Sequence, residues 1–172
     1  MTYALHRPLY TADILVNALS TATDRPMLHL LGGPTLTAGE VRDETSRMIQ
    51  ALASLGVGKG TRVGLISPNR PEVLHASHAV QLLAAVYVPM HPLSGLADHL
   101  HVIRDSGVEV LIFDADRFAG RAKEIGTEMP GLKLKAFGDC AIADNLTTLA
   151  ATFTPRPLVA PEVGTSIMQL MR

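Results

Sequence analysis

The amino-acid sequence predicts an α/β protein with a predominantly parallel sheet, flanking helices and a small N-terminal β-hairpin. Four short apolar runs indicate the strands of the sheet, at residues 62–66, 86–90, 109–113 and 132–137. Corresponding positions in successive runs are 23 residues apart, as from Val63 to Val86, which leaves room for one helix in each gap. Strands that alternate with helices are typical of βαβ units. The first three runs are almost continuously apolar, as expected of strands covered on both faces.

The first 36 residues predict a helix and the hairpin. The helix is expected over residues 11–20. Residues 27–31 and 35–36 are expected to form two short strands around Gly32-Gly33-Pro34, because glycine and proline are typical turn residues.

The next helix carries a capping box at its start. The Thr37 hydroxyl can accept a hydrogen bond from the backbone amide three residues on, while the Glu40 carboxylate reaches back to the amide of Thr37. One stripe of the helix is then formed by Val41, Thr45, Met48, Leu52 and Leu55. Gly56 is expected to end the helix in the left-handed conformation.

Three further helices are expected between the strands. The second helix starts at Asn69, with Pro71 in its first turn, where the missing proline N–H has no helical partner to lose. The third starts near Ser94 and ends at Ser106-Gly107, and the fourth covers residues 116–125.

The C-terminal part is less regular. Residues 141–161 predict a short helix and then a loop, and residues 164–171 form an apolar, strand-like run that stops at Arg172. We therefore expect a single subdomain over residues 1–172 that is cut short within a strand. Its parts are the lead-in at 1–36, the βαβ core at 37–140, the loop at 141–161 and the interrupted strand at 162–172.

The composition excludes several classes of protein. The chain has 15 Lys and Arg against 16 Asp and Glu, so no excess of cations can neutralise nucleic-acid phosphates. One cysteine, Cys140, excludes a disulfide framework and a cysteine-based zinc cluster. Residues 73–97 contain no Asp, Glu, Lys or Arg, but two prolines and several histidines favour a buried helix and strand over a transmembrane segment.

No phosphate-binding loop is present among the glycine motifs. Residues 56–60, GVGKG, are rich in glycine, but they follow a predicted helix and precede a predicted strand. A phosphate loop needs the opposite order, so that backbone amides at a helix N-terminus meet the anion. These residues are therefore interpreted as a helix terminator and a tight turn.

The histidines favour no metal site. His75 and His78 are three positions apart on a predicted helix and could share a metal, with His91, His99 and His101 as further candidates. His99 and His101 point to different sides of their helix, and no His-Glu-x-x-His motif is present. We interpret these histidines as packed or solvated side chains.

Three other residues are candidates for chemistry. Cys140 has no basic cluster around it that would lower the pKa of its thiol. Asp114 and Asp116 follow a strand at the carboxyl edge of the sheet, where doubly wound proteins bind ligands. The simpler interpretation is that Asp116 caps the next helix.

Two segments resemble core motifs of the adenylate-forming acyl-CoA synthetases, the AMP-binding enzymes. Residues 36–41, LTAGEV, resemble a Leu-Thr/Ser-Tyr-x-Glu-Leu motif, and residues 82–92, LLAAVYVPMHP, resemble a Leu-x-Ala/Gly-Gly-Ala-x-Tyr-Val-Pro-x-x-Pro motif. Further similar pieces follow the family's order at residues 53–63, 67–72 and 105–112. Ala38 and Ala84 depart from the usual Tyr and Gly.

The resemblance implies the N-terminal portion of a ligase that activates a carboxylic acid with ATP to an acyl-adenylate and transfers it to coenzyme A. Fatty-acid metabolism is the expected setting, and ATP, Mg²⁺ and coenzyme A are implied for the intact enzyme. The family's phosphate loop, Ser/Thr-Gly-Thr-Thr-Gly-x-Pro-Lys, follows the strand that residues 164–171 resemble, and it is not in this chain.

The resemblance therefore assigns no catalytic, cofactor-binding or metal-binding residue here, and we expect the 172-residue chain alone to be inactive and to hold no cofactor. The matching motif positions are structural: Leu36, Thr37, Glu40, Asn69, Pro71, Tyr87, Pro89 and Pro92.

The expected partners are the missing C-terminal portion of the same enzyme and, through an exposed apolar face, a second copy of the chain. We expect a cytoplasmic location. A peripheral position at a membrane surface is the other option for the intact enzyme. The alternative is a stand-alone doubly wound module that binds a nucleotide or small acid near Ser67, Pro89 and Asp114. A non-enzymatic interaction domain is a third hypothesis.

Overall fold

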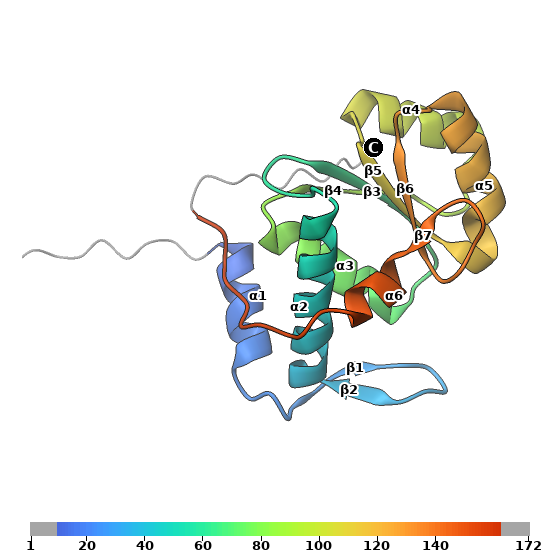
Figure 1. The fold of residues 1–172 in the computed structure, drawn as a ribbon. Helices are drawn as coiled ribbons and strands as arrows, with labels where there is room; N and C mark the ends of the chain where they lie inside the picture. The colour runs from blue at the N-terminus through green and yellow to red at the C-terminus, as the bar shows by residue number, and fades with distance from the viewer. Residues whose placement is uncertain (1–9, 163–172) are drawn as a thin grey trace, which may run out of the picture.

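The computed structural model describes residues 10–162 of the 172-residue chain, and the strand expected at residues 164–171 lies outside the described residues. The helices of the described part are α1 (Thr11–Ser20), α2 (Ala38–Ser54), α3 (Pro71–Leu82), α4 (Leu96–Ser106), α5 (Ala115–Glu128) and α6 (Leu146–Ala151). The strands are β1 (Pro26–His29), β2 (Thr35–Thr37), β3 (Arg62–Ile66), β4 (Val86–Pro89), β5 (Val110–Asp114), β6 (Lys133–Phe137) and β7 (Asp144–Asn145). Figure 1 shows their arrangement.

The main sheet is parallel, with the strand order β4-β3-β5-β6-β7. The four predicted apolar runs form β3 to β6, so the predicted α/β class and parallel sheet are confirmed. The chain leaves β3 for β4 on one side and then returns to β5 on the other side of β3. This reversal makes a topological switch point between the carboxyl ends of β3 and β5.

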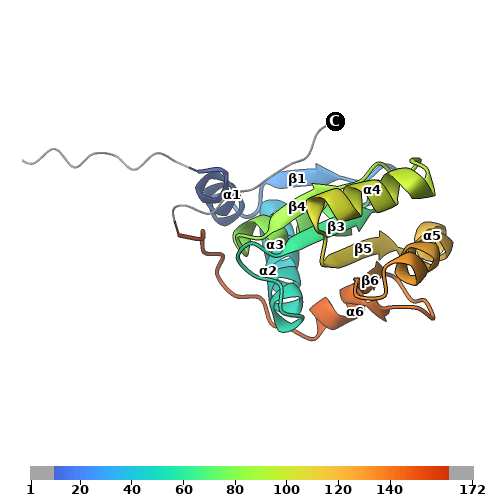
Figure 2. The same ribbon diagram turned by 90° about the horizontal axis from the view of Figure 1, so that it is seen from above.

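Helices cover both faces of this sheet. One apolar core joins the sheet to α2, α3 and α6 through residues such as Leu52, Val80 and Leu146. A second core joins the opposite face to α4 and α5 through Ile103 and Ile125. Figure 2 shows the sheet between the two groups of helices. Two covered faces explain why the strand sequences are almost continuously apolar.

The small antiparallel hairpin of β1 and β2 is also confirmed, with Leu28 opposite Leu36. It leads directly into α2. Helix α1 covers the predicted residues, and its buried Leu19 packs with Val41 of α2 and Leu158 of the C-terminal segment.

Two predicted helix starts are corrected by the structure. The N-cap of α3 is Arg70 rather than Asn69, and Pro71 is the first helical residue. The start moves because the backbone of Arg70 is still extended, as the residue before a proline prefers. The N-cap of α5 is Asp114 rather than Asp116, since the Asp114 carboxylate accepts from the amide of Arg117 at 2.9 Å.

The segment after β6 contains more structure than the sequence indicates. The short helix expected there is α6, but the two-residue strand β7 pairs with β6 and was missed. The loop after α6 is attached along α2. The Ser46 hydroxyl donates to the carbonyl of Arg156 at 2.8 Å and accepts from its amide at 2.7 Å, and Gln50 donates to the carbonyl of Thr154 at 2.8 Å.

No helix within residues 10–162 combines the length and the apolar character that crossing a membrane requires.

Candidate functional site

The switch point of the sheet holds a compact group of charged side chains. Arg70 lies in the loop after β3, and Asp114 ends β5. Arg70 Nη1 donates to Asp114 Oδ2 at 2.6 Å, and its Nε and Nη2 donate to the two carboxylate oxygens of Glu72 at 2.8 Å each. The guanidinium carbon also lies 5.6 Å from the ring centroid of Phe137, at the end of β6. We call Arg70, Glu72, Asp114 and Phe137 the carboxyl-edge cluster.

The cluster satisfies its charges internally. Hydrogen bonds to Glu72 raise the pKa of the Arg70 guanidinium above its ordinary value against the effect of burial, and Asp114 adds to the rise. Burial acts to raise the pKa of the Glu72 carboxyl, but the Arg70 hydrogen bonds, a hydrogen bond from the Glu72 backbone and the charges of Arg70 and His75 together lower that pKa overall. One cation faces two carboxylates, so the cluster has no surplus positive charge for a phosphate.

Ser67 and Pro89, the other residues expected at this edge, also have structural contacts. Ser67 is buried, and its hydroxyl donates to the carbonyl of Pro68 at 2.9 Å. Pro89 ends β4, opposite Leu65 of β3. The edge where doubly wound proteins bind ligands is therefore held together by the protein's own side chains.

The first family-like motif lies at the junction of β2 and α2. Leu36 is part of β2 and packs into the apolar core below α1. The Thr37 amide donates to Glu40 Oε2 at 2.7 Å, and the Glu40 amide donates to the Thr37 hydroxyl at 3.2 Å. The predicted capping box is confirmed. These residues fix where α2 begins.

Asn69 and Pro71 flank the residue that matters in this loop. Asn69 is exposed, and Pro71 begins α3. The sequence motif indicated Asn69 and Pro71 as structural positions, but it did not indicate Arg70 between them. A charged residue just after one strand, with an acidic residue at the end of the neighbouring strand, is the signal that could have found the pair.

The second family-like motif covers the edge strand β4. The amides of Val86 and Met90 donate to carbonyls of the β3 segment, at 2.8 and 2.9 Å. The backbone nitrogens of Tyr87 and Pro89 therefore face the opposite side of β4, where this strand has no strand partner among residues 10–162. Proline is tolerated there because it removes no ladder hydrogen bond.

The last two motif positions, Tyr87 and Pro92, lie in β4 and in the loop that follows it. The Tyr87 side chain is half-buried against the core beneath α2 and α3, and burial raises the pKa of its hydroxyl. Pro92 lies in the loop that joins β4 to α4.

His99 is the best-connected histidine, and it is buried. Its Nε2 lies 2.9 Å from the carbonyl of His91, and its Nδ1 lies 3.1 Å from Nη1 of Arg121. Because the arginine can only donate, Nδ1 accepts and the ring is the neutral tautomer with its proton on Nε2. Burial and the Arg121 charge lower the pKa of His99 despite the His91 hydrogen bond. His99 thus ties the loop after β4 to α5.

His75 and His78 lie on α3 as predicted, and each has a ring nitrogen without a hydrogen-bond partner, Nε2 in His75 and Nδ1 in His78. Burial lowers the pKa of both rings, with the Glu44 and Glu72 charges opposing it at His75. At His78 burial and the neighbouring His75 lower the pKa to about 4. Across residues 10–162, no group of three or more His, Cys, Asp or Glu is placed to hold a metal ion.

The glycine-rich turn and the cysteine are not part of the carboxyl-edge cluster. Gly56 and Gly60 have positive φ angles of 86° and 82°, and their turn connects α2 to β3 in the predicted order of helix then strand. Cys140 follows β6 and donates through Sγ to the carbonyl of Ala143, at 3.6 Å.

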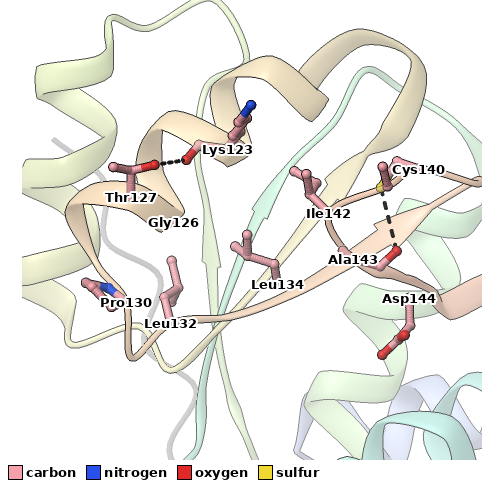
Figure 3. A pocket seen from close by; sticks show the side chains of 11 residues that line it. Lys123, Gly126, Thr127, Pro130, Leu132, Leu134, Cys140, Ile142, Ala143 and Asp144 are labelled. Carbon is pink, nitrogen blue, oxygen red and sulfur yellow. Dashed lines mark hydrogen bonds between the residues drawn. The ribbon is translucent and has the colours of Figure 1, made fainter.

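A cavity of about 660 Å³ lies between α5 and the loop from Cys140 to Asp144. Figure 3 shows it with Leu132, Leu134 and Ile142 among the side chains that line it. None of its lining residues belongs to the carboxyl-edge cluster.

Comparison with known proteins identifies relatives along most of the chain. The family model described as "AMP-binding enzyme" matches residues 16–158. The chain is 37% identical over 166 residues to the medium/long-chain-fatty-acid–CoA ligase FadD8 of Mycobacterium tuberculosis, a match that covers 92% of this chain and 29% of FadD8. It is 36% identical over 81 residues to the feruloyl-CoA synthase of an Amycolatopsis species, covering 47% of this chain and 16% of that protein. The chain thus spans less than a third of the length of either relative.

Solved structures share the fold at lower identity. The N-terminal domain of FACL13 from Mycobacterium tuberculosis matches with a TM-score of 0.74 and 21% identity, over 91% of this chain and 39% of that one. A benzoate CoA ligase from Burkholderia xenovorans LB400 matches with a TM-score of 0.75 and 20% identity, over 88% of this chain and 30% of that one. At these identities the likeness is one of fold.

Proposed function

The chain belongs to the AMP-binding enzyme family, and we propose that it is the N-terminal portion of an acyl-CoA synthetase. The intact enzyme would activate a carboxylic acid with ATP to an acyl-adenylate and transfer the acyl group to coenzyme A. The observation that carries the proposal is the match to FadD8, which runs along 92% of this chain at 37% identity.

A fatty acid is the proposed substrate. The relative named for medium- and long-chain fatty acids matches 92% of the chain, whereas the one named for feruloyl-CoA matches 47% at similar identity. The longer match favours an aliphatic acid over an aryl acid.

We propose that the 172-residue chain alone does not catalyse adenylation. Adenylation requires cations and amides directed at the α-phosphate of ATP. Arg70, the cation at the switch point of the sheet, is bound to two carboxylates and does not fit a nucleotide phosphate. ATP, Mg²⁺ and coenzyme A would therefore bind mainly to parts of the enzyme outside residues 10–162.

The role of this part would be that of a scaffold that contributes one wall of the acyl pocket and contacts the rest of the enzyme. Exposed apolar side chains provide surface for such contacts, notably Leu93 after β4 and Val159 after α6, which are 86% and 75% exposed. We also propose that a second copy of the chain associates through such surface. A cytoplasmic location is proposed as well.

The alternative of a stand-alone module that binds a nucleotide or small acid at the carboxyl edge has no observation in its favour within residues 10–162. The carboxyl edge that it would use is closed by the ion pair of Arg70 with Asp114, and the cluster is not cationic overall.

The substrate proposal is tested on a natural longer chain that contains these 172 residues. Acyl-CoA formation would be measured with octanoate, palmitate, benzoate and ferulate at equal concentrations. Higher kcat/KM for one of the two aliphatic acids supports the proposal. Higher kcat/KM for benzoate or ferulate than for both aliphatic acids contradicts the fatty-acid assignment.

A further inference from the structure

We infer that the cavity between α5 and the loop 140–144 binds a small apolar carboxylate, at a site separate from the carboxyl-edge cluster. The cavity measures about 660 Å³, within the range of about 300–1,000 Å³ that is usual for small-molecule sites. Its lining combines apolar and polar groups, as such sites do. The inference does not depend on the proposed function, because it concerns residues outside the cluster discussed above.

The floor of the cavity is apolar. Leu132, just before β6, and Leu134 within β6 contribute it, and Ile142 closes it from the loop 140–144 (Figure 3). Gly126 of α5 allows the helix to lie close to the strand, since a Cβ there would lie 3.0 Å from Leu134 Cδ1. An aliphatic or aromatic body placed on this floor would leave water for an apolar contact.

The loop wall is preformed. Cys140 and Ala143 pair as an isolated β-bridge, and the Cys140 thiol donates to the Ala143 carbonyl. The side-chain Nδ2 of Asn145 donates to Asp139 Oδ1 at 2.9 Å and closes the base of the loop. A loop that is fixed by its own hydrogen bonds needs little ordering when a ligand binds, which favours affinity.

The charged side chains that line the cavity favour a ligand with an anionic end. Lys123 stands at the rim on α5, and no carboxylate of residues 10–162 forms an ion pair with it. The carboxylate at the other end of the cavity, Asp144, is already bound to Lys135 Nζ at 2.5 Å, and that hydrogen bond lowers the pKa of its carboxyl. The available charge at the rim is therefore positive.

Octanoate is the probe, used below its micelle-forming concentration with the 172-residue chain. Equilibrium dialysis of radiolabelled octanoate measures the affinity, for which we expect a Kd on the order of 1 mM for so small a ligand. Octanol, which lacks the charge, should bind more weakly.

Cys140 locates the binding, because it is the sole cysteine and lines the cavity. Octanoate should slow its alkylation by iodoacetamide, a neutral reagent that does not itself respond to Lys123. The variant Lys123→Met should weaken octanoate binding by about two- to fivefold, as loss of a partly exposed ion pair does. The matched variant Lys59→Met, which changes an exposed lysine outside the cavity, should leave the Kd unchanged.

The inference is overturned if octanoate shows no saturable binding, or binds without protecting Cys140. Equal affinity in Lys123→Met and the unchanged protein would also overturn it, because the contact would then be unselective adsorption to apolar surface.

Discussion

Arg70 and Asp114 are 44 positions apart in the sequence, and their side chains meet at 2.6 Å where the strand order of the sheet reverses. The pair joins the loop after β3 to the end of β5. Asp114 has a second task, since its other oxygen accepts from the Arg117 amide and caps α5. One buried carboxylate thus holds the start of a helix and closes the edge of the sheet.

The first prediction is that Asp114→Ala destabilises the protein by about 3 kcal/mol, because it breaks a partly buried ion pair and removes an N-cap. The loss stays moderate because Arg70 keeps its two hydrogen bonds to Glu72. Urea unfolding measures it. Asp116→Ala is the matched control, since Asp116 is exposed and should change the free energy of unfolding by less than about 0.5 kcal/mol. Equal effects of the two variants would refute the role given to Asp114.

The second prediction concerns the close approach at Gly64 of β3. A Cβ at this position would lie 2.9 Å from both Met90 Cε and Val108 Cγ1. The methionine end can move, but the branched valine cannot move as freely, so Gly64→Ala should destabilise the protein by about 1–3 kcal/mol. Thermal and urea unfolding provide the measurement.

Gly120 in α5 provides a control of opposite sign. It lies on the exposed side of the helix, and a Cβ there would meet nothing within 4 Å. Gly120→Ala should stabilise the protein by about 0.5–1 kcal/mol. Stabilisation by both substitutions would show that the space around Gly64 is not as tight as described.

The third prediction concerns the attachment of the segment after α6 to α2. Ser46→Ala removes both hydrogen bonds to the backbone of Arg156, whose amide and carbonyl are partly buried at this contact. The amide of Arg156 should then exchange with solvent about tenfold faster or more, as loss of about 1–2 kcal/mol of local stability implies. Hydrogen exchange followed by NMR measures it. Ser54→Ala, which removes only a bond to Ala51 within α2, should leave that exchange rate unchanged.

The fourth prediction is a loss of stability in mild acid through His78. Burial lowers the pKa of His78 to about 4, below its ordinary value of 6.5, so the unfolded chain binds the proton first as the pH falls. Stability is therefore full above pH 6.5 and declines from there toward pH 4. Between pH 7 and pH 5 this group should remove at most about 2 kcal/mol.

The variant His78→Leu, which fills the site with an apolar side chain that cannot titrate, should flatten the decline by that amount. The interval between pH 7 and pH 5 lies mostly above the range in which carboxyl groups of unfolded chains titrate. Parallel stability curves for the two proteins over that interval would contradict the assignment to His78.

Much of the fold could be predicted because its signals are local. The apolar runs predicted β3 to β6. Thr37 and Glu40, three residues apart, indicated the start of α2. Gly107, with a φ angle of 63°, ends α4 where the sequence predicts. Each of these features depends on residues that are close in the chain.

The features that could not be predicted depend on distant residues. The two-residue strand β7 is too short and too polar to stand out, and it exists because β6 offers an edge to pair with. Asp116 is as good a capping residue by type as Asp114, but α5 begins at Ala115, so Asp114 occupies the N-cap position, and its other oxygen binds Arg70. Ser46 and Arg156 are 110 positions apart, and nothing in either segment indicates the other.

We propose that this chain is one part of an acyl-activating enzyme and lacks the means to adenylate alone. ATP–pyrophosphate exchange tests it most directly, with the 172-residue chain and a natural longer chain containing it assayed side by side on octanoate and palmitate. We expect exchange that depends on the fatty acid in the longer chain and none above background in the 172-residue chain. Clear exchange by the 172-residue chain, or none by a folded longer chain with either acid, would contradict it.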